Sequence, residues 1–432
     1  MVVNDLQGQL YAGVVEVEIT PPVGVPMAGY GARKQNSAGI HDPLNAQTLY
    51  LRLDNEQLLL ITCDLIGVDL NFTTRLRQDI ANELDIPHDH VMISCSHTHS
   101  GPQGFLPDEP VHVSLKDEGL VDITQRKLLG ASKWAVSKAE PVSLSVGDLD
   151  LTGICKNRND PENGSIDPQL NVLRFDTTSK QPSAVLFNYG CHPTVMGHDN
   201  LKITADLPGA ARAALKRHYP DCVFIFTNGA SGDVSTRFTR REQKFSEVNR
   251  LGFILASGVM QAMMKSEPIE VADIGGERIK VQLPQRELPQ AAEIQSTIGK
   301  LEEKIKRLKE QSAPHGEIRK VFTQLEGAQG QLIMVNTKID PSFFATELQF
   351  LHIGPLFLAG IPGEPFSQTV LDIKADCSPT KTIVISYAND IKGYFPDQAA
   401  IENNTYEALI SPYDRRVSDL IYQLTVDHCH GG

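Results

Sequence analysis

The spacing of hydrophobic residues changes along the chain, and each spacing predicts a type of element. In VVEVEIT (14–20) apolar and acidic residues alternate, which is typical of a strand with one buried face. Phe72, Leu76, Ile80 and Leu84 recur at every fourth position, which predicts a helix. The chain therefore contains both element types within its first hundred residues.

Short apolar runs and helical stretches then alternate through the rest of the chain. QTLYLRL (47–53) and QLLLITC (57–63) flank a polar turn, which predicts a β-hairpin. Five further runs have the length of buried strands: 90–96, 183–189, 222–227, 356–360 and 382–387. Helical stretches near 206–217, 244–265 and 366–376 fall among them. This alternation predicts an α/β fold, with a mixed central β-sheet covered by helices.

Residues 288–337 show a different pattern and predict an inserted antiparallel helical hairpin. A first seam has the 4-3-4-3 spacing of a coiled coil and consists of Ile294, Ile298, Leu301, Ile305 and Leu308. SAPHG (312–316) interrupts it, and a second seam follows at Ile318, Phe322, Leu325, Ala328 and Leu332. Charged residues surround both seams, so we expect a hairpin that projects from the body, as an oligomerisation arm or a lid. The alternative is an ordinary pair of core helices.

Composition narrows the class of protein. The 432 residues are 41% apolar, which is enough for a sizeable core, and no repeat or linker divides them, so we expect one catalytic domain over 1–432. The net charge of −13 argues against nucleic acid and anionic membrane surfaces as partners, because both are negatively charged. It does not exclude a lipid-like substrate. No run approaches the roughly 20 apolar residues of a membrane span, so we expect no stable membrane insertion.

The N-terminus and the cysteines bear on location. MVVNDLQGQL has neither a basic region nor an apolar core of the kind that a signal peptide needs. The seven cysteines are scattered without a CxxC pair, which favours free buried thiols in a reducing compartment. We therefore expect a cytoplasmic protein.

Candidate chemistry begins at SCSHTHSGP (94–102), where an apolar run ends. Residues i and i+2 of a strand share a face, so His97 and His99 are expected to project together. Ligands bind at the carboxyl ends of strands in open α/β sheets, and Gly101-Pro102 ends this strand. The pair is compatible with a metal site, a proton-transfer site or a polar strand end.

Other predicted strands also end in polar residues. His192 follows SAVLF, Ser235 follows CVFIF after a Gly-rich turn, Glu364 follows LFL, and Tyr394 follows TIVI. Each alone could be a turn or capping residue. Histidine, histidine and glutamate together are a recurrent ligand set for catalytic zinc, with a further position for water.

Motifs in a constant order then suggest a family. The chain resembles the neutral/alkaline (non-lysosomal) ceramidases through VEVEITPP, the MAGYG turn and AGIHDPLNAQTLYL in its first part. Seven further motifs follow in the same order as in the family: SHTHSGP, the NR…D…VLRF stretch within 156–175, GCHPT, TADLPG, SGDVS, PGEPF and YANDIKGY.

The resemblance implies a role for each matching residue. His97, His192 and Glu364 match zinc ligands; Tyr394 fits the fourth, tyrosine ligand best, and Tyr387 is the alternative. His99 matches a histidine beside the reacting water. Arg158 and Tyr406 match groups that face the substrate carbonyl, and Ser235 matches a serine proposed as a nucleophile, which zinc-activated water makes unnecessary.

Together these residues imply a zinc-dependent amidohydrolase that cleaves a linear amide of an N-acyl, lipid-like compound. Larger members of the family carry a further C-terminal domain and are secreted or membrane-associated. Because we expect a cytoplasmic protein here, hydrolysis of a linear amide is a firmer expectation than ceramide as the substrate. The alternatives are a zinc esterase or deacetylase acting on a small polar substrate, and a non-catalytic scaffold that binds a partner through the hairpin. Separately, we expect that the hairpin could join copies of the chain into a homo-oligomer.

Overall fold

The computed structural model describes residues 8–105, 116–337 and 339–430, and its largest element is a mixed sheet of nine strands. Eight of them lie in the spatial order β11-β9-β8-β6-β1-β3-β4-β5, and β13 pairs with β6. Their bounds are β1 (Leu10–Glu18), β3 (Asn45–Leu53), β4 (Glu56–Cys63), β5 (Val91–Cys95), β6 (Glu140–Asp150), β8 (Gln169–Thr177), β9 (Pro182–Tyr189), β11 (Val223–Asn228) and β13 (Glu267–Ile269).

A second sheet of four strands packs on one face of the large sheet. Its order is β14 (Ile274–Gln282), β15 (Ala345–Ile353), β16 (Leu356–Gly360) and β18 (Lys381–Ile385). Leucines of both sheets, such as Leu51 and Leu60 on one and Leu351 and Leu358 on the other, share one buried cluster. This second sheet could not be predicted from the sequence, because strands between two sheets and strands under helices are similarly apolar.

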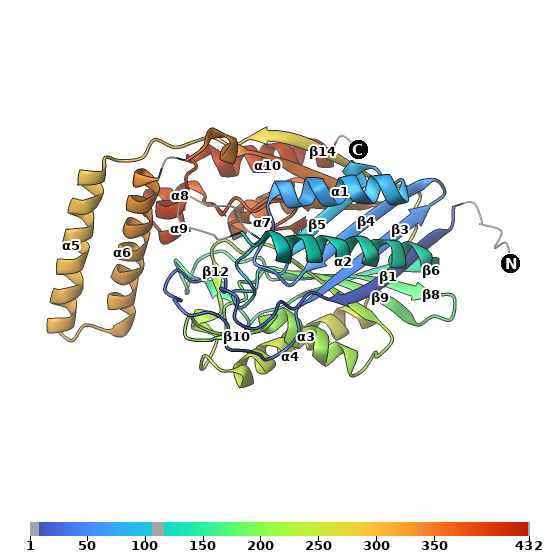
Figure 1. The fold of residues 1–432 in the computed structure, drawn as a ribbon, viewed down its shortest axis with the longest axis horizontal. Helices are drawn as coiled ribbons and strands as arrows, with labels where there is room; N and C mark the ends of the chain where they lie inside the picture. Colours follow the sequence, from blue (N-terminus) through green and yellow to red (C-terminus); the bar gives the residue numbers. More distant parts are fainter. Residues whose placement is uncertain (1–7, 106–115, 338, 431–432) are drawn as a thin grey trace.

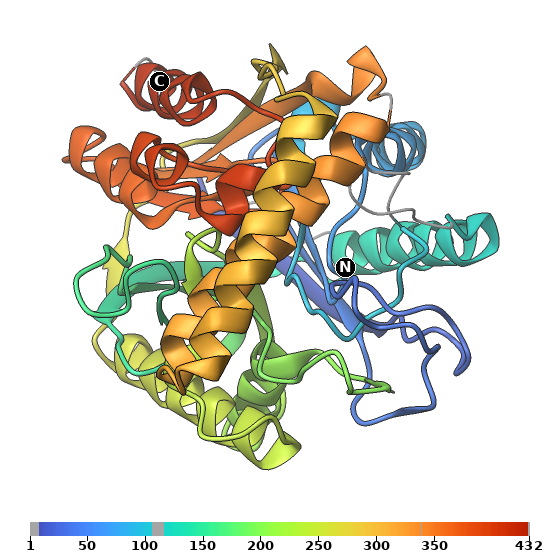
Figure 2. The same ribbon diagram turned by 90° about the vertical axis from the view of Figure 1, so that its left-hand side faces the viewer.

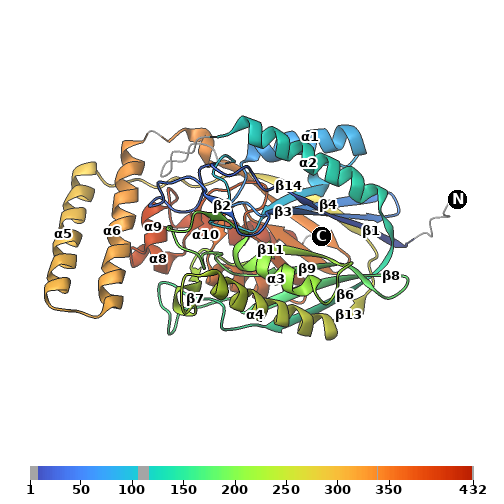
Figure 3. The same cartoon turned by 60° about the horizontal axis from the view of Figure 1, so that its bottom comes forward.

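Helices cover the outer faces and complete four layers (Figure 1). The large sheet carries α1 (Leu70–Leu84), α2 (Glu118–Ser137), α3 (Asp206–Lys216) and α4 (Phe245–Met264). The small sheet carries α7 (Ser367–Asp376) and α10 (Arg416–Cys429). Figure 3 shows α1 and α2 on one part of the large sheet and α3 and α4 on another. The predicted α/β class, with a mixed sheet covered by helices, is confirmed.

The first helix shows how the sequence pattern produces an element. The Asp69 carboxylate accepts a hydrogen bond of 2.7 Å from the amide of Phe72 and so caps α1. Phe72, Leu76 and Ile80 are fully buried against the large sheet. The four-residue spacing therefore becomes one apolar face, as the sequence predicts.

The site is built where strands of this sheet end. β9 and β11 run parallel, and β11 also contacts β5, so the loops that follow β5, β9 and β11 are brought together. Short strand pairs tie these loops together: β2 (Gly39–Ile40) with β10 (Lys202–Ile203), β7 (Lys156–Asn157) with β12 (Val234–Ser235), and β17 (Glu364–Pro365) with β19 (Tyr394–Phe395).

The helical hairpin exists and consists of α5 (Ala291–Glu310) and α6 (His315–Asn336). It projects from the sheets in Figure 1 and crosses in front of them when viewed from its own side in Figure 2. α6 packs on α9 (Tyr406–Ile410), which follows α8 (Gln398–Glu402). The predicted second seam is wrong at one position: Phe322 is 38% exposed, and its neighbour Val321 is buried against α5 instead.

Two cysteines contradict the expectation of free thiols. Cys377, at the end of α7, and Cys429, at the end of α10, form a disulfide. The other five are free and buried: Cys63, Cys95, Cys155, Cys191 and Cys222. The pairing was missed because 52 residues separate the partners and only helix packing brings them together. The disulfide removes free thiols as a reason to expect a cytoplasmic location, and that location stays a prediction.

Within the described ranges, none of the helices has both the length and the apolar composition to cross a membrane.

Candidate metal centre

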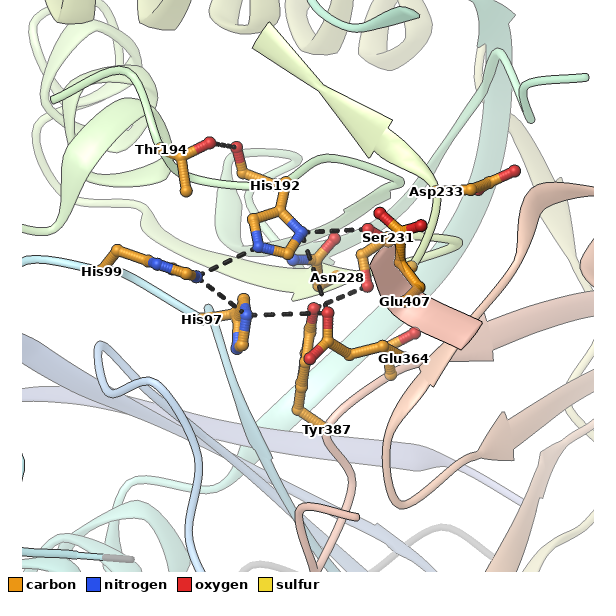
Figure 4. Close-up of polar contacts among 12 residues, drawn as sticks. His97, His99, His192, Thr194, Asn228, Ser231, Asp233, Glu364, Tyr387 and Glu407 are labelled. Atoms are coloured by element: carbon orange, nitrogen blue, oxygen red, sulfur yellow. Dashed lines mark hydrogen bonds and ion pairs between the residues drawn. The ribbon is translucent and has the colours of Figure 1, made fainter. Parts of the chain in front are cut away.

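Three histidine side chains meet beyond the ends of β5 and β9. His97 and His99 follow β5, and His192 follows β9. Nε2 of His99 lies 3.1 Å from Nε2 of His97 and 3.1 Å from Nε2 of His192. All three side chains are buried, and one ring nitrogen from each lies within 4.8 Å of the others (Figure 4). The structure thus brings together the three histidines that the sequence singles out.

The reason for this convergence differs from the predicted one. β5 ends at Cys95, and His97 has a φ of 66°, so the two histidines lie in a turn and not on one face of a strand. Hydrogen bonds from the amides of Ser96 and His97 to the carbonyls of Cys63 and Leu65 hold this turn. A left-handed conformation is costly for a residue with a side chain, and such strain clusters at functional sites.

The hydrogen bonds of two histidines define their tautomers. Nδ1 of His97 lies 2.7 Å from the carbonyl oxygen of Ile66, and Nδ1 of His192 lies 3.0 Å from the carbonyl oxygen of Ser231. A carbonyl oxygen can only accept, so each Nδ1 carries the proton and each Nε2 presents a lone pair. Backbone-oriented imidazoles of this kind are typical of metal ligands.

The same histidines are neutral at neutral pH. Burial, opposed by the Ile66 carbonyl and assisted by the charge of Arg158, lowers the pKa of His97 to about 3. Burial also lowers the pKa of His99 and of His192 well below the usual value, and the neighbouring His97 adds to this. Neutral imidazole is the form that binds a metal ion.

Glu364 adds a carboxylate to the group. Its Oε2 atom lies 3.9 Å from Nε2 of His97 and 3.8 Å from Nδ1 of His192, and its side chain is buried. Ligand atoms about 2.1 Å from a tetrahedral zinc ion are roughly 3.4 Å apart. The 3.9 Å between His97 Nε2 and Glu364 Oε2 is close to this spacing, and nitrogens of His97 and His192 lie within 4.8 Å of each other, so these residues fit a metal ion.

The two candidate tyrosines lie in different surroundings. The ring of Tyr387 stacks on His97 with a centroid distance of 4.0 Å, and its hydroxyl lies 2.7 Å from Oγ of Ser231. In Figure 4, Tyr387 and Glu364 lie on the side of the histidines opposite His99. Tyr394 instead lies under the guanidinium of Arg158, 5.1 Å from it. The structure therefore places Tyr387, the alternative from the sequence, against His97, and Tyr394 against Arg158.

Arg158 is held rigidly near these groups. Its Nε forms a 2.5 Å ion pair with Oε1 of Glu407, and its Nη2 donates to the carbonyl of Gly232 at 2.5 Å. Burial lowers the pKa of the guanidinium, but the carboxylate of Glu407 and the neighbouring Tyr394 raise it by more, so the group stays charged. Tyr406 begins α9 with its ring 6.3 Å from that of Tyr394. Tyr394, Tyr406 and Arg158 thus form one polar group beside the histidines.

Ser235 has a structural role in the fold. It is buried, and its Oγ accepts a hydrogen bond of 3.1 Å from the amide of Arg237, which caps the short helix η2 (Thr236–Phe238). The neighbouring Asp233 accepts from the amide and the hydroxyl of Ser367 and from Asn157. These bonds anchor the turn that carries Arg158 and explain why the Gly-rich segment is polar.

Sequence reasoning missed residues that position the histidines. Asn228 donates to the carbonyl of Ser96 and accepts from the amide of Cys191, so it joins the two histidine loops. Ser231 orients His192 through its carbonyl and contacts Tyr387 through its hydroxyl. The only signal for them was the segment TNGASGDVS after a strand, which does not say which polar residue faces the site.

Comparison with known proteins decides the family. A family model described as neutral/alkaline non-lysosomal ceramidase, N-terminal, matches residues 11–247, which is more than half of the chain. The chain belongs to this family. The neutral ceramidase A of Dictyostelium discoideum is 24% identical over 236 residues, and the neutral ceramidase of Pseudomonas aeruginosa is 26% identical over 218 residues. These alignments cover 50% and 46% of this chain but only 32% of each relative.

Solved structures show the same fold. The crystal structure of the neutral ceramidase from Pseudomonas aeruginosa matches with a TM-score of 0.79 at 19% identity, over 98% of this chain and 74% of that one. A structure titled "Ceramidase complexed with C2" matches with a TM-score of 0.78. The ceramidase family model includes His97, His99, Arg158, His192 and Ser235, whereas Glu364 and the three tyrosines lie beyond its end. The candidate donors that lie outside the matched segment are therefore brought to the histidines by the fold.

Proposed function

We propose that this ceramidase-family protein is a zinc-dependent hydrolase that cleaves the linear amide bond of an N-acyl compound. The convergence of Nε2 lone pairs from His97 and His192 on one buried point, beside the Glu364 carboxylate, carries the proposal. The relatives named neutral ceramidases support an amide of a long-chain acid as the substrate class.

In this proposal His97, His192, Glu364 and Tyr387 hold the ion. A zinc ion in such a site polarises a substrate carbonyl and lowers the pKa of a coordinated water to about 7. Two histidines, a carboxylate and a phenol suit four-coordinate zinc, which takes nitrogen and oxygen ligands in this way.

His99 is the proton-transfer group. Its Nε2 faces both ligand histidines, and it can accept a proton as water adds its oxygen to the acyl carbon. It can return that proton to the nitrogen as the C–N bond breaks, so that a carboxylic acid and an amine leave. Arg158 and Tyr406 lie together, and either can donate a hydrogen bond to the carbonyl oxygen as it gains negative charge.

Metal content and hydrolysis, measured on one preparation before and after chelation, test the proposal. We expect about one zinc per chain and hydrolysis of an N-acyl amide that the chelator abolishes and zinc restores. Comparing long and short acyl chains separates this enzyme from an esterase or deacetylase. No bound metal together with no hydrolysis after zinc addition would refute the proposal and favour a binding scaffold.

Two histidine variants separate the roles. We expect His192→Ala to lose both zinc and activity. We expect His99→Ala to keep zinc but to slow turnover by roughly 10²–10⁴, the usual contribution of acid–base catalysis. His198→Ala is the matched control, because His198 is exposed and lies six residues from His192. Loss of zinc from the His99 variant would make His99 a ligand.

A further inference from the structure

Asp206, in the motif TADLPG (204–209), begins α3 in an unusual conformation. The residue is buried and has a φ of 51°, in the left-handed region that residues with a side chain rarely adopt. It is not an ordinary helix cap, because the N-cap position belongs to Ala205, whose side chain makes no capping hydrogen bond. A buried carboxylate and a strained backbone are both costly, and such strain clusters at functional sites.

The Asp206 carboxylate binds the loop that follows His192. Its Oδ2 atom accepts a hydrogen bond of 3.3 Å from the amide of Met196. Its Oδ1 atom accepts from the amide of Val195 at 3.4 Å and from the amide of Leu207 at 2.7 Å. Both carboxylate oxygens therefore hold the loop after His192 against the first turn of α3.

These three amides help to compensate a buried charge. Burial raises the pKa of Asp206 to about 6 and the nearby Asp42 adds to this, whereas the three amides oppose the rise. The charge of Arg240 also interacts with this carboxylate. The carboxylate is therefore ionised at neutral pH, and hydrogen bonds to an ionised acceptor are roughly twice as strong as those between neutral groups.

The residues just before Asp206 bind the turn that carries His99. The carbonyl of Thr204 accepts a hydrogen bond of 2.7 Å from Oγ1 of Thr98, and the amide of Thr204 donates to the carbonyl of Ser100 at 3.1 Å. Thr98 and Ser100 are the two neighbours of His99 in the sequence. The Thr204 hydroxyl in turn accepts from the amide of Asp206 at 3.0 Å. This short segment therefore joins the two histidine loops.

The two histidine loops are thus linked on both sides of their histidines. Asn228 bonds to the residues that directly precede His97 and His192. Asp206 bonds to residues that follow His192, and its neighbour Thr204 bonds to residues that follow His97. Both links bind backbone atoms, so together they fix the chain segments from which the imidazole rings project.

A movement of the loop after His192 would also reach His99. The hydroxyl of Tyr30 donates to the carbonyl of Met196 at 2.7 Å, and the amide of Met196 is one of those that Asp206 binds. The edge of the Tyr30 ring lies against His99, with a centroid distance of 5.0 Å. The position of this loop therefore bears on the third histidine as well.

We propose that Asp206 is a positioning residue of the metal centre, whose carboxylate fixes the spacing between His192 and the turn that carries His97 and His99. This inference rests on the proposed function, because it takes the histidine cluster to be a zinc site. Asp206 acts through the loop backbone and is itself not a ligand.

Zinc affinity, measured on the purified full chain by competition with a chelator, tests the inference. Asp206→Gly removes the carboxylate without backbone strain, because glycine tolerates a positive φ. We expect it to weaken zinc binding about 10- to 100-fold, the usual effect of losing a group that orients metal ligands. Asp206→Asn is equally neutral but keeps one oxygen for the amides of Val195 and Leu207. We therefore expect it to bind zinc more tightly than Asp206→Gly and less tightly than the wild type.

Asp85→Gly is the matched control. Asp85 is exposed and has a φ of 55°, so the same substitution removes the same charge at a similar backbone conformation. We expect the zinc affinity of this variant to equal that of the wild type.

Hydrogen exchange of the metal-free protein locates the change. We expect Asp206→Gly to speed amide exchange about 10-fold in residues 97–102 and 192–198, because the bonds that hold these segments are lost. A residue that only stabilised α3 would instead speed exchange in α3 alone.

Three results would overturn the inference: Asp206→Gly with the zinc affinity of the wild type, Asp206→Asn with the affinity of Asp206→Gly, or exchange that rises in α3 alone. The second result would assign the effect to charge and not to the hydrogen bonds. If Asp206→Gly does not fold, Asp206→Asn decides, and wild-type zinc affinity in that variant refutes the role. If the wild type binds no zinc, the proposed function fails, and the exchange experiment, which needs no metal, then decides whether Asp206 positions the histidine loops.

Discussion

A methyl group at Gly29 tests whether the position of His99 controls the site. Gly29 has a φ of +95°, and a Cβ on it would lie 2.4 Å from Cγ and Nδ1 of the His99 ring. The ring cannot retreat freely, because its Nε2 faces two histidines and its edge meets the ring of Tyr30 at 5.0 Å. Gly29→Ala must therefore move the imidazole away from its partners.

The size of the effect follows from two separate costs. A non-glycine residue at positive φ costs about 1–3 kcal/mol. Forcing a methyl group into filled space costs about 1–3 kcal/mol more. Gly24 separates the two costs, because its φ is +101° and no atom would lie within 4 Å of its Cβ. Gly24→Ala therefore carries the backbone cost alone.

Urea denaturation, zinc content and amide hydrolysis are measured on both variants. We expect Gly24→Ala to lower the free energy of unfolding without changing turnover. We expect Gly29→Ala to lower it roughly twice as much and to slow hydrolysis roughly 10–100-fold, the usual effect of disturbing groups around a metal site. Equal turnover in the two variants would refute the link between Gly29 and His99.

Three further predictions concern the surroundings of the histidines. Tyr387→Phe should weaken zinc binding roughly 10–100-fold, whereas Tyr394→Phe should leave it unchanged; dialysis against a zinc buffer measures both, and the opposite order would return Tyr394 to the ligand set. Glu407→Gln should lower the free energy of unfolding by about 3 kcal/mol, because it leaves the Arg158 charge without its carboxylate; a loss below about 1 kcal/mol in urea would show that solvent compensates that charge. The metal-free protein should lose stability as the pH falls from about 6.5 toward 3, because His97 in the unfolded chain takes up a proton that the folded state excludes. The contribution of His97 to this loss in the free energy of unfolding reaches roughly 5 kcal/mol at pH 3. An identical pH dependence of unfolding in the wild type and in His97→Gln would contradict the prediction.

The elements with a regular hydrophobic period could be predicted from the sequence, and their packing could not. The spacing at Phe72, Leu76 and Ile80 leads directly to α1, because a helix face depends on local geometry alone. The second seam of the hairpin failed at Phe322, since Val321 is also apolar and only the contact with α5 and α9 decides which side chain faces inward. The glycine at position 327 also depends on packing between helices, because a Cβ there would lie 2.8 Å from the Leu409 side chain of α9.

The site was also predictable in part. His97, His192 and Glu364 follow predicted strands and have the residue types of a zinc hydrolase, but it was the resemblance to the ceramidases that proposed them as ligands. The choice between Tyr387 and Tyr394 could not be made in this way. The two residues lie seven positions apart after β18, and only the pairing of β17 with β19 sets Tyr394 opposite Glu364.

The sequence by itself determined the alternation of strands and helices, the helical hairpin and the candidate ligands, because each depends on residue type and on spacing over a few positions. The tertiary structure alone decided the second sheet, the Cys377–Cys429 disulfide and the turn that joins His97 to His99. All three depend on contacts between segments, or on backbone conformation, that the spacing of residue types does not encode. The physical reason is that side-chain chemistry is local, whereas burial, pairing and electrostatic field arise from neighbours that only the folded chain supplies.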